Sequence, residues 1–149
     1  MPVRSICTHT VAVIAPDADV VTAAEKMREA HVGDLVVIEY REGRQIPIGI
    51  ITDRDIVVGV VAKGVDPTKL TVADVMSAEL LTVHEENGIE FALREMRRVG
   101  VRRAPVVGTH GELVGVLSIV DALDHFAAAL GHIADIIRLG QQLEADMRP

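Results

Sequence analysis

The chain contains an internal duplication, and this feature constrains its fold more than any other. Residues 7–38 align with residues 76–107 without a gap, at an offset of 69 positions. Further along, the offset falls to 66 because the first copy carries a longer polar segment at residues 39–45. A single insertion in a loop is what the duplication of one supersecondary unit leaves behind. The sequence therefore predicts two similar units in tandem.

Each copy shows the order strand, helix, strand, strand, helix. In the first copy the apolar patterns predict these elements at residues 11–14, 20–30, 35–38, 46–51 and 56–62, with a polar loop before the last strand. The run at 35–38 is apolar throughout, which is typical of a strand buried on both faces. We therefore expect mixed α and β structure in each unit.

The second copy repeats this order with clearer boundaries. Asn87 is expected to cap a helix that ends at Gly100, with Glu90 at the capping-box position. Strands at 106–107 and 113–117 then follow, joined by a tight glycine-containing turn.

Both copies place a Thr/Ser-x-x-Asp turn between an apolar strand and a helix. The hydroxyl of Thr52 or Ser118 can accept a hydrogen bond from an unpaired N–H of the first helical turn, and Asp55 or Asp121 can reach back. The same groups can hold a ligand, because a helix start offers N–H donors to a phosphate and a carboxylate can accept bonds from two ribose hydroxyls. One copy alone would be interpreted as a helix cap. Its duplication in matched surroundings favours a second role in ligand binding.

The composition narrows the classes of function. Hydrophobic residues make up 49% of the chain, enough for a core, whereas 2% aromatic residues and a net charge of −7 argue against nucleic acid and anionic lipid. The single cysteine, Cys7, excludes an internal disulfide, and the six histidines show no metal-ligand spacing. No Gly-x-Ser-x-Gly motif is present, and we expect no enzyme. With no signal-peptide pattern and no apolar run of about 18 residues, we expect a cytoplasmic protein without a membrane span.

An amphipathic helix is predicted from Ala122 onward. Its apolar residues lie along one side, made of Leu123, Phe126, Ala127, Leu130, Ile133, Ala134 and Ile137. The polar side is not rich in Lys or Arg, as it is in helices that lie on membranes. This apolar side therefore predicts a packing surface or the seam of a homodimer.

The motifs quoted above resemble a tandem pair of CBS domains, also called a Bateman module. The resemblance rests on the duplicated Gly-apolar-apolar-Thr/Ser-x-x-Asp turn, on the Val-Ala-Asp-Val-Met lead-in at 72–76, and on Gly-Val-Arg-Arg-Ala-Pro-Val at 100–106. It implies an α+β fold of two β-α-β-β-α repeats packed about a pseudo-twofold axis, plus the C-terminal helix. The expected divisions are repeat 1 at 3–63, a linker at 64–71, repeat 2 at 72–130 and a tail at 131–149.

The resemblance also implies a ligand. Relatives bind AMP, ADP, ATP or S-adenosylmethionine in two clefts between the repeats, with the Asp of the turn on the ribose and an Arg on phosphate. Adenine is expected near residues 8–12 and 77–81. The candidate ligand-binding residues are Thr52, Arg54, Asp55, Arg102, Arg103, Ala104, Ser118 and Asp121.

The two copies differ where phosphate would bind. The first has Gly33 and Asp34 where the second has Arg102 and Arg103. Together with Arg94, Arg97 and Arg98, these arginines form either a solvated helix face or, for Arg102 and Arg103, a phosphate contact. An acid repels phosphate, so we expect one good nucleotide site and one weaker or empty site. The sequence leaves open which cleft is the weaker.

The function expected from these observations is a standalone sensor that binds an adenosine ligand and modulates a protein partner or its own dimer. The alternative is a ligand-free dimeric scaffold with vestigial clefts, in which the turns act only as caps.

Overall fold

The computed structural model describes residues 1–148 and contains two three-stranded sheets. The first sheet consists of β1 (Val13–Ile14), β2 (Asp34–Arg41) and β3 (Arg44–Thr52), and the second of β4 (Val83–His84), β5 (Arg103–Val107) and β6 (Leu113–Ser118). In each sheet the first strand pairs parallel with the second, and the second antiparallel with the third. The predicted duplication of one α+β unit is therefore confirmed. We call the elements β1 to α2 unit 1, and the elements β4 to β6 with the first turn of α5 unit 2.

The helices follow the strands in the predicted order. They are α1 (Val20–Ala30), α2 (Asp53–Ile56) with a wider π-helical turn at Val57–Val61, α3 (Val72–Val75), α4 (Ile89–Val99) and α5 (Ile119–Met147), with short 3-10 turns at Val3–Ser5 and Pro67–Lys69. The bounds of α1 are those predicted. Helix α2 begins three residues before the predicted start at residue 56, because Thr52 at the end of β3 caps it directly.

The predicted polar loop at 39–45 is wrong. In the structure these residues continue β2 and β3, with Tyr40 opposite Gln45 and Arg41 opposite Arg44. Only Glu42 and Gly43 form the turn, with φ angles of 51° and 76°. A two-residue hairpin turn of this kind requires positive φ at both positions, and a single glycine in a charged segment is a weak signal for it.

The predicted cap at Asn87 is also wrong, whereas the predicted helix end at Gly100 is confirmed. The N-cap of α4 is Gly88, without a side-chain hydrogen bond, and Asn87 Oδ1 instead accepts from the His84 N–H at 2.9 Å. Asn87 therefore closes the turn before the helix. Gly100 ends α4 in the left-handed conformation, with φ of 80°.

Each unit completes its core with the segment that leads into the other unit. Val3 and Cys7, from the N-terminal segment, are buried in the core of unit 2. Val72, from the segment before unit 2, is buried in the core of unit 1, and Met76 packs against it. This exchange ties the two units together.

The exchanged segments also extend the partner sheets. Thr8 and Val116 of β6 exchange two backbone hydrogen bonds of 2.9 Å, and Ser77 pairs in the same way with Ile50 of β3. A Cβ atom at Gly49 or Gly115 would lie 2.8 Å from the carbonyl oxygen of Ser77 or Thr8, closer than real contacts allow. Both glycines are therefore required by the crossing of the lead-in segment. Because the same contact occurs twice, the units are related by a pseudo-twofold axis.

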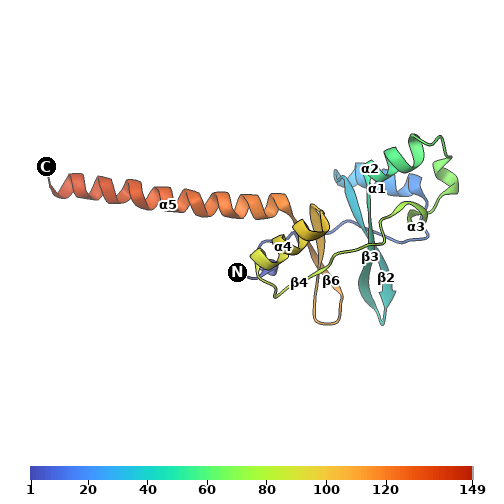
Figure 1. Ribbon diagram of the computed structural model, residues 1–149, viewed down its shortest axis with the longest axis horizontal. Helices are drawn as coiled ribbons and strands as arrows, with labels where there is room; N and C mark the ends of the chain where they lie inside the picture. The colour runs from blue at the N-terminus through green and yellow to red at the C-terminus, as the bar shows by residue number, and fades with distance from the viewer. Residues whose placement is uncertain (149) are drawn as a thin grey trace.

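Helix α5 leaves the body formed by the two units (Figure 1). The helices α1, α2 and α3 gather at the end of the molecule remote from the C-terminus, and α4 lies near the base of α5. Within residues 1–148, no helix combines the length and apolar character that crossing a membrane requires.

Candidate functional site

Two clefts lie between the units, and each takes residues from both. Cleft 1 has a volume of about 740 Å³ and is lined by Gly33, Asp34, Ile50, Thr52, Asp53, Arg54, Asp55, Ser77, Glu79, Leu80, Leu81, Gly100, Val101, Arg102 and Arg103. Cleft 2 has a volume of about 320 Å³ and is lined by Thr8, Thr10, Val11, Ala12, Val32, Asp34, Val36, Arg103, Val116, Ser118, Val120 and Asp121. The two expected adenine segments are thus divided, with residues 77–81 at cleft 1 and 8–12 at cleft 2.

The Thr52 turn forms the capping box that the sequence predicts. The Asp55 N–H donates to Thr52 Oγ1 at 3.0 Å, and the Thr52 N–H donates to Asp55 Oδ2 at 2.9 Å. These bonds fix the Asp55 carboxylate at the start of α2. Because the cap uses Oδ2, the second oxygen, Oδ1, is left for a ligand in cleft 1.

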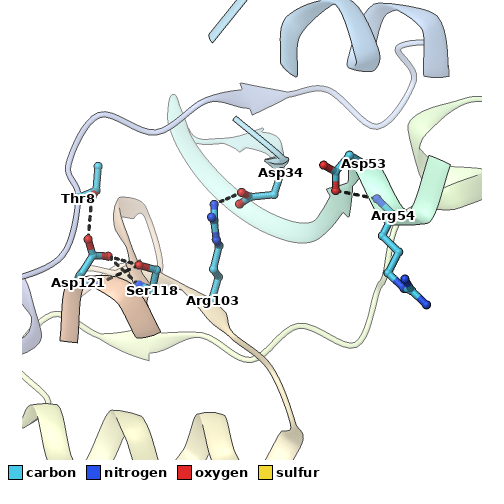
Figure 2. A network of polar contacts seen from close by, with 7 residues as sticks. All are labelled: Thr8, Asp34, Asp53, Arg54, Arg103, Ser118 and Asp121. Atoms are coloured by element: carbon cyan, nitrogen blue, oxygen red, sulfur yellow. Dashed lines mark hydrogen bonds and ion pairs between the residues drawn. The ribbon is translucent and has the colours of Figure 1, made fainter. Parts of the chain in front are cut away.

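The Ser118 turn forms a matching box at cleft 2. The Ser118 N–H and hydroxyl donate to Asp121 Oδ2 at 2.8 and 2.7 Å, and the Asp121 N–H donates to Ser118 Oγ at 3.1 Å. The other oxygen, Asp121 Oδ1, accepts a long bond of 3.5 Å from Thr8 Oγ1 (Figure 2). In cleft 2 the second carboxylate oxygen therefore already faces a protein hydroxyl.

A third capping box shows that the motif alone does not make a site. At the start of α3, the Thr71 N–H and hydroxyl both donate to Asp74 Oδ2 at 2.9 Å. Neither residue lines cleft 1 or cleft 2. A ligand-binding role for the other two boxes therefore depends on the clefts around them.

An ion pair between Asp34 and Arg103 separates the two clefts. Arg103 reaches from β5 to the Asp34 carboxylate at the start of β2 (Figure 2), and both residues line both clefts. The two residues occupy the same position in their units, so their contact lies on the pseudo-twofold axis. The Asp34 side chain is only 10% exposed, whereas that of Arg103 is 46% exposed. Burial raises the pKa of Asp34, the Arg103 charge opposes this shift, and the Asp53 charge adds to it.

The neighbouring positions make the clefts unequal. Arg102 lines cleft 1, whereas its counterpart in unit 1 is Gly33. A Cβ atom at Gly33 would lie 3.1 Å from the Asp53 carboxylate, so an arginine there would require Asp53 to move. Within residues 1–148, neither Arg54 nor Arg102 forms an ion pair. Cleft 1 therefore has two guanidinium groups available to an anion, and cleft 2 has only the arginine that Asp34 already holds.

The structure divides the predicted site residues between the clefts. Thr52, Arg54, Asp55 and Arg102 lie in cleft 1, Ser118 and Asp121 lie in cleft 2, and Arg103 lines both. Ala104 is fully buried in the core of unit 2 and lines neither cleft, so any contact with a ligand would come from its backbone.

Asp53 and Glu79 were not expected from the sequence as site residues, and neither was the ion pair of Asp34 with Arg103. One feature of the sequence could have indicated this ion pair. Asp34 and Arg103 occupy equivalent positions in the two repeats, and equivalent residues meet when they lie near the pseudo-twofold axis. Asp53 and Glu79 add negative charge to cleft 1. Among residues 1–148 no group of three or more His, Cys, Asp or Glu side chains is arranged to hold a metal ion.

Comparison with known proteins gives a consistent result. The model of the CBS domain matches residues 3–61 and 72–128. "Uncharacterized protein MK0525" of Methanopyrus kandleri is 37% identical over 109 residues, which are 73% of this chain but only 54% of that protein, so the chain spans about half of this relative. "CBS domain-containing protein YhcV" of Bacillus subtilis is 32% identical over 119 residues, covering 80% of this chain and 81% of that protein.

A solved structure also matches. The CBS domain protein PAE2072 from Pyrobaculum aerophilum, complexed with AMP, superposes with a TM-score of 0.72 at 26% identity, covering 81% of this chain and 89% of that chain.

Proposed function

This chain belongs to the CBS-domain family, and from this membership we propose that it is a regulatory module whose cleft 1 binds a phosphate-bearing adenosine nucleotide. The observation that carries the proposal is the pair of unpaired guanidinium groups, Arg54 and Arg102, in the larger cleft beside a fixed carboxylate. The AMP complex of the Pyrobaculum aerophilum relative supports an adenosine ligand.

Each group in cleft 1 suits a different part of such a ligand. Asp55 Oδ1 can accept hydrogen bonds from the ribose hydroxyls, while Thr52 holds that carboxylate in place. Leu80 and Leu81 offer apolar surface to the adenine ring. Arg102 can bind phosphate oxygens through two parallel N–H donors. S-adenosylmethionine carries no phosphate for Arg54 and Arg102 to bind, so AMP, ADP and ATP fit this cleft better.

Binding in cleft 1 would connect the two units. The carboxylate comes from unit 1 and Arg102 from unit 2, so one ligand contacts both sides. A ligand of this kind favours whichever relative arrangement of the units brings these groups together, and it shifts the population toward that arrangement. We propose that a protein partner, or another copy of the chain, responds to this shift, which makes the role regulatory and not catalytic.

The alternative function is a scaffold without a ligand. The capping box at Thr71 favours it, because the same Thr-x-x-Asp motif exists in this chain outside cleft 1 and cleft 2. In the scaffold, the boxes at Thr52 and Ser118 would serve only to start α2 and α5.

Thermal unfolding in the presence of AMP, ADP, ATP, adenosine and S-adenosylmethionine separates the two functions. A ligand at 100 times its Kd stabilises the folded state by about 2.7 kcal/mol. For a chain of this size that corresponds to a rise in Tm of about 5 to 10 °C. We expect such a rise with at least one phosphate-bearing nucleotide, and about half to two thirds of it when Asp55 is replaced by Asn. No change with any of the five compounds would favour the scaffold.

A further inference from the structure

Most of α5 has no packing partner within the chain. The helix spans 29 residues, and Ala122 is its only buried residue. At about 1.5 Å per residue it is roughly 43 Å long, and beyond its first turns it runs clear of both units (Figure 1). A free helix of this length gains its stability in proteins mainly from the packing of an apolar face.

The exposed apolar surface of α5 is large enough for a stable interface. Beyond the first turn, nine large apolar side chains are between 40% and 77% exposed, namely Leu123, Phe126, Leu130, Ile133, Ile136, Ile137, Leu139, Leu143 and Met147. Burying a side chain of this kind removes about 60 to 120 Å² of apolar surface from water. Together they offer roughly 500 to 1,000 Å², comparable to the ~800 Å² that each partner contributes to a standard interface. The largest apolar patch of a typical monomer is about 300 to 600 Å².

The spacing of these residues is that of a helix packed against other helices. Steps of four and three residues alternate without interruption through a row of apolar and small residues, which we call the stripe. It consists of Ala122, Phe126, Ala129, Ile133, Ile136, Gly140, Leu143 and Met147. On a straight helix, a row of residues with this repeat rotates around the helix axis by about 20° every seven residues. The row therefore stays in one interface only when the helices wind around each other. A pocket on a globular partner requires no such repeat along the whole helix.

The width of the face favours more than two helices. Leu123, Leu130 and Ile137 lie beside the stripe, at seven-residue intervals, and extend it to three positions in seven for most of its length. Two-stranded coiled coils use the narrower two positions in seven, whereas helices of a bundle use three. The small residues Ala129 and Gly140 allow neighbouring helices to approach closely.

The charges on α5 disfavour a membrane surface as the occupant. The helix carries five acids and one arginine, Arg138, which is paired with Asp135. Helices that lie on anionic membranes have polar faces rich in Lys and Arg. Asp124, Asp135 and Arg138 lie on the side opposite the stripe, which leaves the stripe itself uncharged up to its last turn.

We propose that α5 is a self-association element, in which the stripes of several copies of this chain pack together as a helix bundle. The stripe of one copy packs against the stripe of a second copy. Because the two copies are identical, the two stripes are equally apolar, equally long and equally spaced. The proposal does not depend on nucleotide binding, because no residue of the stripe lines either cleft.

Two adjacent alanines provide a matched test. Ala129 lies in the stripe and Ala128 lies on the outer side, and both are exposed. Replacement of either by Glu adds the same side chain and the same charge. By sedimentation equilibrium of the full chain, we expect Ala128→Glu to assemble as the wild type does. Ala129→Glu should dissociate at concentrations at least tenfold higher, and Ile136→Glu should weaken assembly further. A monomeric wild type would overturn the proposal, as would an assembly that survives both stripe variants unchanged.

Cross-linking locates the contact directly. Ile133 lies near the midpoint of the stripe, where it meets its counterpart in both a parallel and an antiparallel pair, whereas Arg138 faces outward. A disulfide forms only when the two Cα atoms come within about 7 Å, and the native Cys7 is buried. Under mild oxidation we expect Ile133→Cys, but not Arg138→Cys, to give covalent dimers on a denaturing gel. Equal cross-linking by both variants, or by neither, would place the interface elsewhere.

Discussion

The two clefts have the same frame and different chemistry. Each is built around a capping box with a fixed carboxylate, Asp55 in cleft 1 and Asp121 in cleft 2, and each is crossed by the lead-in segment of the other unit. Cleft 1, however, is more than twice as large and contains two unpaired arginines. The two units therefore share the backbone arrangement that both need to fold, whereas the charges inside their clefts differ.

Part of this divergence lies at one pair of adjacent positions. Gly33 and Asp34 of unit 1 correspond to Arg102 and Arg103 of unit 2. Because these positions lie near the pseudo-twofold axis, Asp34 and Arg103 meet and neutralise each other between the clefts. Arg102 then remains, together with Arg54, as a cation that lines cleft 1 and not cleft 2.

The largest expected effect is that of Arg102→Ala on nucleotide binding. A hydrogen-bonded contact with a charged group contributes about 1.5 to 3 kcal/mol, so calorimetric titration should show AMP binding weakened by roughly ten- to a hundredfold. Arg97→Ala is the matched control, because Arg97 is exposed on α4 and lines neither cleft. Equal losses in the two variants would mean that general positive charge, and not the position of Arg102, holds the nucleotide.

The next effect separates the two carboxylates. Asp55→Asn should weaken AMP binding by about five- to tenfold, since a neutral amide replaces the charged acceptor while the cap to Thr52 can persist. Asp121→Asn should leave this affinity unchanged, because Asp121 lines only cleft 2. Asp74→Asn, in the capping box that lines neither cleft 1 nor cleft 2, controls for the loss of a cap. If Asp121→Asn causes the larger loss in titrations with AMP, the assignment of the nucleotide to cleft 1 is wrong.

A smaller gain is expected when the ion pair between the clefts is released. In Asp34→Asn the Arg103 guanidinium loses its partner and becomes available to a ligand phosphate. A partly exposed ion pair is worth up to about 1 kcal/mol, so AMP affinity should rise by about two- to fivefold. The double variant Asp34→Asn with Arg103→Gln should lose this gain. An affinity that falls in the single variant would show that the pair supports the cleft more than it competes with the ligand.

The smallest expected effect concerns stability and pH. The pKa of Asp34 is raised above its ordinary value of 3.8, chiefly by burial. The folded state therefore binds this proton more tightly than the unfolded chain. The stabilising contribution of the group is fully present below about pH 3.8 and is lost as pH rises through the raised pKa.

Asp34→Asn removes this dependence, so the stability of the variant relative to the wild type should improve as pH rises from 4 toward 7. Urea unfolding of both proteins at several pH values measures the difference. The Arg103 and Asp53 charges face Asp34 from β5 and α2, and a difference that changes with pH in the opposite direction would show that the attraction of Arg103 dominates.

The sequence by itself determined the elements and their repetition. The bounds of α1, the two capping boxes and the end of α4 at Gly100 were predictable, because hydrogen bonds and apolar spacing within a few residues fix them. The two-residue turn at Glu42 and Gly43 and the role of Asn87 were missed. The turn depends on two positive φ angles, and the role of Asn87 depends on one hydrogen bond. Several sequences satisfy each of these conditions equally well.

Which groups share a cleft depends on the tertiary structure and could not be predicted from the sequence. Arg102 is 16 residues from Ser118 in the sequence, yet it lies in the cleft of Thr52 and Asp55. This follows from the exchange of lead-in segments, in which Thr8 pairs with Val116 and Ser77 with Ile50. Such pairings join residues far apart in the chain and depend on how both units pack as wholes. The sequence therefore specified two equivalent carboxylates and placed Arg54 next to one of them, and the packing of the units brought Arg102 into the same cleft.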